Sequence, residues 1–369
     1  MSAADAAEEP VAPSGVEDLR RIIEEVLLGG GRIWTKRDIA ERAGVEPERT
    51  VQIWHALGFP AVDDDAKVFT DADVDALRAG ERLIEAGLIT EETETLMARA
   101  LGHHLSRLAE WQVHTLWSWV NRESGLPLDG RELMDRAVEL LPEMELMQRH
   151  VWRRHLAAYA GRALAEAEDH VVVGAGQGHG GPGVVAVGGP TLPREGADVR
   201  DLAVGFTDMV GYTRMTRGLD NGELVQVLNR FEGLTGDVVA EGRGRVVKTI
   251  GDEVLFVCES ASAAADIALE LTARARAEQS LPRVRTGLAH GAVLSRFGDV
   301  YGATVNVAAR LTAVARPGTV LVNTALAGEL AGLAAYELKG LRPVSVRGYS
   351  RLRPVLLRSH RTHEAAARR

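Results

Sequence analysis

Apolar residues recur with helical spacing from Val16 to about Gly161, which predicts that the first half of the chain is helical. In residues 18–28, apolar side chains at positions 19, 22, 23, 26 and 27 share one helical face. The pattern predicts further helices over residues 81–88, 92–101, 105–120, 131–141 and 145–164. Turn signals at Gly87, Gly102 and Pro142 separate these helices. The sequence therefore predicts an all-α domain over residues 16–164.

From residue 199 onward, short apolar runs alternate with amphipathic segments. Strands are expected over residues 202–206, 246–250, 254–257, 284–290, 292–297 and 319–322, with helices over 221–241, 261–277 and 304–314. Mixed strands with two or three helices on one face predict a ferredoxin-like sandwich over residues 199–358. The fold class is therefore α+β, with an all-helical N-terminal domain and a C-terminal ferredoxin-like domain.

A glycine-rich stretch separates the two halves and predicts a linker over residues 165–198. Within it Gly176, Gly178 and Gly181 match the spacing G-x-G-x-x-G. A dinucleotide-binding loop must open a helix, but Pro182 and Gly183 follow here, so a tether is favoured. Residues 1–15 and 359–369 are expected to be flexible tails.

Residues 35–45 and 49–58 resemble the helix-turn-helix of MerR-type regulators. DNA binding needs a basic surface, but residues 35–80 hold six Lys or Arg against ten Asp or Glu. The acidic balance favours a helix-turn-helix used for packing over one that contacts DNA.

Composition narrows the class of protein further. The net charge of −9 provides no basic field for nucleic acid or anionic membranes. The single cysteine, Cys258, excludes an internal disulfide framework and fits a cytoplasmic protein. No stretch is apolar enough to predict a membrane span. All six tryptophans lie in the helical half, and a Trp-rich helix over residues 111–119 is expected in the core, with a dimer interface as the alternative.

Two carboxylates stand at predicted strand ends. Asp208 ends the strand 202–206, and Asp252 lies in the turn of the predicted hairpin. Carboxylates at the ends of adjacent strands can hold two divalent cations for in-line attack on phosphorus. Taken singly, Asp208 could instead cap a helix and Asp252 could be an ordinary turn residue.

A third polar cluster lies on the small, apolar helix predicted over residues 304–314. Asn306 and Arg310 are four residues apart, so a helix places both on one face. Asp299 precedes them by seven and eleven residues. A purely structural helix rarely needs an aligned Asn and Arg on such a surface.

These motifs resemble the class III nucleotide cyclases. The matching segments are residues 206–213 (Phe-Thr-Asp-Met-Val-Gly-Tyr-Thr), residues 248–252 (Lys-Thr-Ile-Gly-Asp), and Asp299 with Asn306 and Arg310. The resemblance covers about residues 199–355. It implies that the ribose 3′-oxygen attacks the α-phosphorus to give a 3′,5′-cyclic nucleotide and pyrophosphate. It also implies a homodimer in which each site takes the metal-binding residues from one chain and the other residues from its partner.

The resemblance assigns a role to each motif residue. Asp208 and Asp252 would bind two Mg²⁺ or Mn²⁺ ions, and Asn306 and Arg310 would contact the ribose and the reacting phosphorus. Lys248 and Asp299 would select the base. A lysine donor and an aspartate acceptor match adenine N1 and the adenine amine, so ATP is preferred to GTP.

The triphosphate contact is less well defined. Some family members have an arginine directly after the glycine that matches Gly291, but here that residue is Ala292. Lys339 resembles the late phosphate-binding lysine of the family, and Arg296 is a further candidate. A lysine in such a turn is also commonly a solvated surface residue.

The helical half resembles the regulatory region of actinobacterial, mycobacterial-type cyclases, some of which respond to pH. Histidine titrates near neutrality, and this half contains His103, His104, His114, His150 and His155. The prediction is therefore a regulated adenylate cyclase. The alternatives are a guanylate cyclase of the same fold and a DNA-binding regulator with a degenerate nucleotide-sensing domain.

Overall fold

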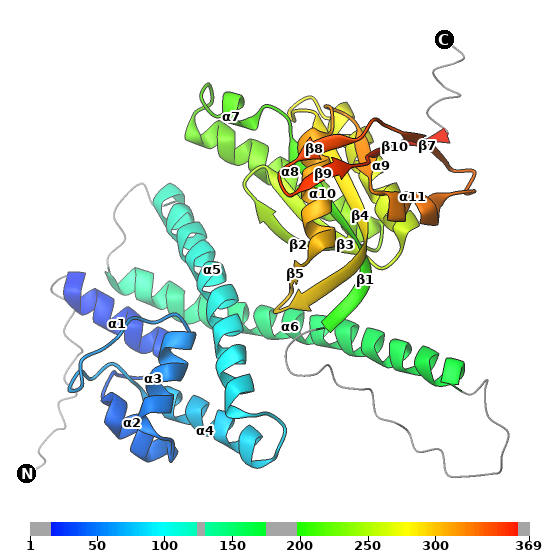
Figure 1. Cartoon of the computed structure of the whole chain (residues 1–369). Helices are drawn as coiled ribbons and strands as arrows, with labels where there is room; N and C mark the ends of the chain where they lie inside the picture. Colours follow the sequence, from blue (N-terminus) through cyan, green and yellow to red (C-terminus); the bar gives the residue numbers. More distant parts are fainter. Residues whose placement is uncertain (1–15, 124–129, 175–197, 361–369) are drawn as a thin grey trace, which may run out of the picture. The chain divides into compact units, whose positions relative to one another are not determined.

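The computed structural model describes residues 16–123, 130–174 and 198–360 (Figure 1). Two compact units divide the chain between Pro190 and Thr191, and each is described by itself. The predicted tail over residues 1–15, the G-x-G-x-x-G motif and residues 361–369 lie outside the described residues. In the described part of the chain, no helix combines the length and apolar character needed to cross a bilayer.

The described part of the first unit is helical, as the sequence predicted, apart from one β-bridge between Trp34 and Phe69. Its helices are α1 (Val16–Leu28), α2 (Lys36–Ala43), α3 (Pro47–Ala56), α4 (Asp71–Glu85), α5 (Glu91–Glu123) and α6 (Gly130–Gly174). The predicted helix-turn-helix is formed by α2 and α3. Thr35 begins α2 with a capping box to Asp38, and Gly44 ends it in the left-handed region at φ 74°.

The helix boundaries in this unit differ from the prediction. Helix α5 continues through Gly102, because this glycine packs against the backbone of α3. An added Cβ would lie 2.2 Å from the carbonyl oxygen of Leu57. Helix α6 likewise continues through Pro142, whose missing N–H removes only one hydrogen bond of a long helix. The region predicted as helix 81–88 is the end of α4 and the turn that follows it.

Two further boundaries shift at the ends of the units. Helix α6 extends to Gly174, ten residues beyond the predicted end of the helical domain at residue 164, since residues 165–173 contain helix-forming Ala and Glu and no glycine. Strand β10 includes Ser359, which pairs with Tyr336 of β7. The predicted C-terminal tail, residues 359–369, therefore begins too early.

Packing of the first unit leaves the middle of α5 and α6 uncovered in the single chain. The buried cluster comprises Ile39, Ile53, Ala56, Phe69, Val74, Leu77 and Ala98, and therefore lies near α2, α3, α4 and the start of α5. Trp111 on α5 and Trp152 on α6 are 64% and 59% exposed. The expectation that Trp111 belongs to the core is wrong for the single chain, because no described element covers it.

The second unit is built on a mixed sheet with strand order β2-β3-β1-β4-β6-β10-β7, and β5 pairs with β4. Its strands are β1 (Asp198–Met209), β2 (Arg245–Ile250), β3 (Glu253–Cys258), β4 (Val284–Arg296), β5 (Asp299–Tyr301), β6 (Val320–Val322), β7 (Tyr336–Gly340) and β10 (Val355–Ser359). Strands β8 (Val344–Val346) and β9 (Tyr349–Leu352) form a separate hairpin. The two strands predicted over residues 284–297 are one strand, β4, which passes through Gly291 at φ 150°.

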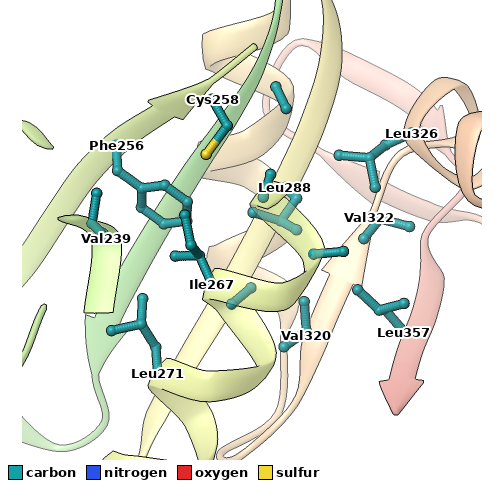
Figure 2. Packing of buried hydrophobic residues seen from close by; sticks show 14 of the residues in the cluster. Val239, Phe256, Cys258, Ile267, Leu271, Leu288, Val320, Val322, Leu326 and Leu357 are labelled. Atoms are coloured by element: carbon teal, nitrogen blue, oxygen red, sulfur yellow. The ribbon is translucent and has the colours of Figure 1, made fainter. Parts of the chain in front are cut away.

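Helices cover both faces of this sheet, not one as the sequence suggested. Helices α8 (Asn221–Glu241), α9 (Ala261–Ala277) and α11 (Thr324–Leu330) pack on one face. Figure 2 shows the core on this side, where Ile267 and Leu271 of α9 lie against Phe256 of β3 and Leu288 of β4. The short helix α7 (Tyr212–Met215) follows β1.

Helix α10 (Ala303–Val314) covers the opposite face. Because side chains alternate along a strand, Ala203 of β1 faces α9, whereas Leu202, Val204 and Phe206 face α10. Asp208 continues the alternation of Leu202, Val204 and Phe206, the residues that face α10. The predicted metal-binding carboxylate therefore lies on the α10 side of the sheet.

Candidate active site

Acidic side chains gather where β1 ends. Asp208 is 9% exposed and lies in register with Glu253 on β3 and with Arg285 on β4. The turn between β2 and β3 is tied to the same point, because the N–H of Met209 donates to the carbonyl of Asp252 at 3.0 Å. The sheet therefore brings three carboxyl groups and one guanidinium together.

Arg285 contacts Asp208 directly. Its Nε and Nη2 both lie 2.6 Å from Oδ2 of Asp208. A third donor, Nη1, binds the carbonyl oxygen of Ala313 in the last turn of α10 at 3.1 Å. Arg285 thus links a predicted metal ligand to the helix that carries Asn306 and Arg310.

The cluster holds more negative charge than Arg285 neutralises. Burial, and then the charge of Asp208, raise the pKa of Asp252. Burial and the charges of Asp208 and Asp252 raise the pKa of Glu253 to about 7. Both acids are therefore harder to ionise than usual, and a divalent cation at this place would relieve the repulsion between them.

The donor set fits divalent metal ions of the hard, oxygen-binding kind. Asp208 and Asp252 offer carboxylate oxygens at the edge of the sheet. Within the described ranges no group of three or more His, Cys, Asp or Glu side chains is arranged to hold a metal ion. The two aspartates would therefore share a metal with ligands from elsewhere, such as substrate phosphate oxygens and water.

A second charged pair links strands β2 and β5, which are not neighbours in the sheet. Lys248 on β2 donates to Asp299 on β5, with Nζ 2.5 Å from Oδ2. Partial burial alone would raise the pKa of Asp299, but the hydrogen bonds from Lys248 and from the N–H of Val300 lower it overall. Asp299 is thus held ionised, as an acceptor, beside a cationic donor.

Asn306 and Arg310 lie one turn apart on α10. Asn306 is exposed, and Arg310 is half-buried. The Nε atom of Arg310 is buried and has no hydrogen-bond partner among the described residues. An unpaired buried donor on a guanidinium is costly, so this side chain is suited to an anionic partner that the single chain does not supply.

Close packing fixes α10 against the sheet. Gly287 on β4 has no side chain, and a Cβ there would lie 2.3 Å from the N of Thr312 and 2.5 Å from the O of Ala308. The hydroxyl of Thr312 also donates to the carbonyl of Phe206 on β1 at 3.2 Å. The helix that carries Asn306 and Arg310 is therefore tied to the strand that carries Asp208.

The two phosphate-binding candidates lie away from this cluster. Lys339 is exposed on β7, which is four strands from β1 and hence roughly 19 Å away within one sheet. The guanidinium of Arg296 lies 5.0 Å from the ring of Phe297, at the exposed end of β4. The structure does not bring either side chain to Asp208 of the same chain. Ala292 places no positive charge after Gly291.

Two residues of the cluster, Glu253 and Arg285, were missed from the sequence. Glu253 directly follows Asp252, and its pairing with Asp208 follows once β1 and β3 are placed side by side. Arg285 had no comparable signal, because its proximity to Asp208 depends on the register of β1 with β4.

Comparison with known proteins assigns a family to each of two regions of the chain. Residues 196–359 match the family described as the adenylate and guanylate cyclase catalytic domain. Residues 14–141 match the adenylate cyclase regulatory domain. The chain is therefore a cyclase with a class III catalytic domain and a regulatory domain before it.

Full-length relatives narrow the family. An adenylate cyclase of Streptomyces coelicolor is 39% identical over 86% of this chain and 77% of its own length. An adenylate cyclase of Glutamicibacter nicotianae is 35% identical over 96% and 87%. A pH-sensitive adenylate cyclase of Mycobacterium tuberculosis is 33% identical over 79% and 68%. The chain belongs to the adenylate cyclase family of these proteins. Among solved structures, the adenylyl cyclase CyaB from P. aeruginosa is 18% identical, covering 44% of this chain and 96% of its own, with a TM-score of 0.40.

Proposed function

We propose that this protein converts ATP to 3′,5′-cyclic AMP and pyrophosphate. The observation that carries the choice of base is the contact between Lys248 and Asp299. Adenine presents an acceptor at N1 and a donor at its amine, which complement a lysine N–H and an ionised carboxylate. Guanine presents the opposite polarity at both positions, so its N–H would face the lysine donor and its carbonyl would face the aspartate acceptor.

Asp208 and Asp252 would hold two Mg²⁺ or Mn²⁺ ions. When bound, these ions would lower the pKa of the ribose 3′-hydroxyl and neutralise the triphosphate charge. Asn306 would orient the ribose so that its 3′-oxygen is in line with the α-phosphorus. The Arg310 guanidinium would stabilise the charge that develops on the phosphoryl oxygens. Lys339 and Arg296 are the candidates for holding the triphosphate.

We propose that the active unit is a homodimer with two composite sites. Each site would take Asp208 and Asp252 from one chain, and Lys248, Asp299, Asn306 and Arg310 from the other. The unpaired Nε of Arg310 supports this arrangement, because its own chain offers it no acceptor among the described residues. The apolar side chains that remain exposed on α5 and α6 provide further surface for association of two chains.

The reaction is tested by incubating the full-length protein with Mn²⁺ and either ATP or GTP, then separating the products. We expect cyclic AMP from ATP and a kcat/KM for GTP at least tenfold lower. Preference for GTP would favour the guanylate cyclase alternative. Absence of either product under varied pH would count against catalysis.

The composite site is tested by mixing two inactive chains, Asp208→Ala and Arg310→Ala. Their heterodimer would contain one intact site, so about half of the wild-type activity per dimer should return. Heterodimers purified with two different affinity tags, and still inactive, would exclude the shared site.

We further propose that the helical unit regulates the catalytic unit in response to pH. His103, His104, His114, His150 and His155 are all exposed in the single chain. They lie on α5 and α6, along the surface where a second chain would pack under this proposal. Protonation there would place positive charges in an interface and shift its stability.

The helix-turn-helix is better explained as a packing unit than as a DNA reader. Arg49 on its second helix is only 12% exposed and contacts Glu81 and Glu94 at 2.6 and 2.5 Å. Arg42 lies over the ring of Trp34, 3.4 Å from its centroid. These cations are used within the unit, which supports the packing interpretation.

A further inference from the structure

We propose that Arg285 is a positioning residue for the metal-binding half of the active site. It holds the carboxylate of Asp208 in a fixed orientation, and a hydrogen bond to the end of α10 holds Arg285 itself in place. This inference rests on the proposed function, because it assigns Asp208 to a metal ion. Arg285 lies outside the sequence motifs and is not one of the acidic residues of the cluster.

Both contacts from Arg285 go to the same oxygen of Asp208. Nε and Nη2 each lie 2.6 Å from Oδ2, and neither contact uses Oδ1. The hydrogen bond from Nε and the ion-pair contact from Nη2 meet at one oxygen, and together they restrict the rotation of the carboxylate about its side-chain bond. The other oxygen, Oδ1, is thereby held in a constant direction.

The third contact explains how the guanidinium is held. Nη1 donates at 3.1 Å to Ala313, whose carbonyl is among the last four of α10 and so has no partner within the helix. The guanidinium is planar and rigid, so fixing one nitrogen fixes the direction of the others. A lysine could keep the positive charge but could not make all three contacts.

The charge of Arg285 affects metal binding, whereas the orientation it imposes affects the reaction rate, and this difference makes the role testable. A positive charge beside Asp208 weakens the attraction of the cluster for a cation. Removing that charge should therefore strengthen Mn²⁺ binding, while the loss of orientation should slow the reaction. A residue needed only for folding would not separate these two quantities.

The test compares Arg285→Met and Arg285→Lys in the full-length protein. Binding of Mn²⁺ alone is measured by electron paramagnetic resonance, and kcat is measured with saturating ATP and Mn²⁺. For Arg285→Met we expect Mn²⁺ to bind about tenfold more tightly and kcat to fall at least tenfold. For Arg285→Lys we expect unchanged Mn²⁺ affinity and a similar fall in kcat.

Arg230 offers a matched control elsewhere on the same unit. Its Nε and Nη2 also bind one carboxylate oxygen, Oε2 of Glu278, at 2.9 and 2.5 Å. Arg230→Met and Arg230→Lys should leave both Mn²⁺ affinity and kcat unchanged. If Arg230→Met lowers kcat as much as Arg285→Met does, the effect is a general one of lost ion pairs and the proposal is wrong.

The outcomes separate this inference from the proposed function. A wild-type protein that makes no cyclic AMP contradicts the proposed function. An active wild type with an undiminished kcat in Arg285→Lys contradicts the inference alone. Weaker Mn²⁺ binding in a folded Arg285→Met chain also contradicts it, and if that variant does not fold, Arg285→Lys carries the test.

A heterodimer locates the effect. In the mixed dimer of Asp208→Ala and Arg310→Ala chains, the metal ligands of the intact site come from the Arg310→Ala chain. Adding Arg285→Lys to that chain should reduce activity at least tenfold, whereas adding it to the Asp208→Ala chain should have less than a twofold effect. Equal losses from both placements would show that Arg285 acts by supporting α10 and not by orienting Asp208.

Discussion

Lys248 and Asp299 are separated by 51 residues in sequence, and their charged groups lie 2.5 Å apart. They come from strands β2 and β5, on opposite sides of the central strands of the sheet order. The pair is partly exposed, with 38% and 25% of the side-chain surfaces accessible. Each partner thus holds the other in place at a partly exposed position.

This pair leads to a prediction on substrate choice. Guanine offers a donor at N1 and an acceptor at O6, so Lys248→Glu with Asp299→Ser reverses both polarities. We expect the ratio of kcat/KM for ATP over GTP to fall by at least about 100-fold in the double variant. Parallel assays with both nucleotides and Mn²⁺ measure it. An unchanged ratio would show that other residues select the base.

Arg310 is expected to act on the reaction itself. Its buried Nε has no hydrogen-bond partner in the described part of the chain, so we expect its contact to form with the substrate. Arg310→Lys should lower kcat by about 100-fold or more and change KM only a few-fold. Arg316→Lys, at an exposed position just after α10, serves as the control. A loss confined to KM would indicate binding of the ground state instead.

Gly287 is expected to be essential for the position of α10. A methyl group there would meet backbone atoms of Ala308 and Thr312, which cannot move independently of the helix. Gly287→Ala should reduce the free energy of unfolding by about 2 to 4 kcal/mol and abolish activity. Gly233→Ala, on α8 with open space around it, should instead stabilise by about 0.5 to 1 kcal/mol. Thermal unfolding of both variants checks this, and equal behaviour would contradict the packing argument.

Glu253 provides a prediction on pH. Its pKa is about 7 in the folded protein, compared with an ordinary value of 4.5. Between these values the folded state keeps a proton that the unfolded state has lost, so stability decreases as pH rises from about 4.5 to 7. In metal-free protein, the free energy of unfolding should therefore fall less with rising pH in Glu253→Gln than in the wild type. The difference should be about 1 kcal/mol after allowance for solvent screening.

The measurement uses residues 191–369, a compact unit with its own core, in the presence of a chelator. This unit contains no tryptophan, so circular dichroism is the suitable probe of denaturant unfolding at pH 5 and pH 8. The same decrease in wild type and variant would place the titration on another group.

Regulation by pH is expected to depend on the helical unit. The full chain and residues 191–369 should give different pH–activity profiles if exposed histidines on α5 and α6 control association. In the full chain, His150→Gln with His155→Gln should shift the profile toward that of the isolated unit. Superimposable profiles for the two proteins would remove the regulatory role.

Local patterns predicted most elements, because each element was marked by its own residues. Helices α8 and α9 have the predicted bounds, since Asp220 and Ser260 cap them and apolar spacing continues to the last turn. At Gly102 the local prediction of a helix end is wrong for a tertiary reason. This glycine resembles a helix breaker in sequence, but its absent side chain is what allows α5 to touch α3.

Only those residues of the candidate site that lie in short sequence motifs could be predicted. Asp208, Asp252, Lys248 and Asp299 lie in short segments whose composition is distinctive. Arg285 and Asp208 are 77 residues apart in sequence. The register of β1 with β4 brings them into contact, and no local pattern encodes that register. The side of the sheet that α10 covers was also unpredictable, because a helix of small apolar residues could pack on either face.

The position of Cys258 has a practical consequence for all of these experiments. This only thiol of the chain is 3% exposed in the β3 core, and burial raises its pKa to about 12. Maleimides and nitroxide reagents react with accessible thiolates, so the wild-type protein should remain unlabelled at neutral pH. A cysteine introduced on α5 or α6 would then be the sole attachment point for a spin label, and distances between two copies of the chain could be measured without altering the native sequence elsewhere.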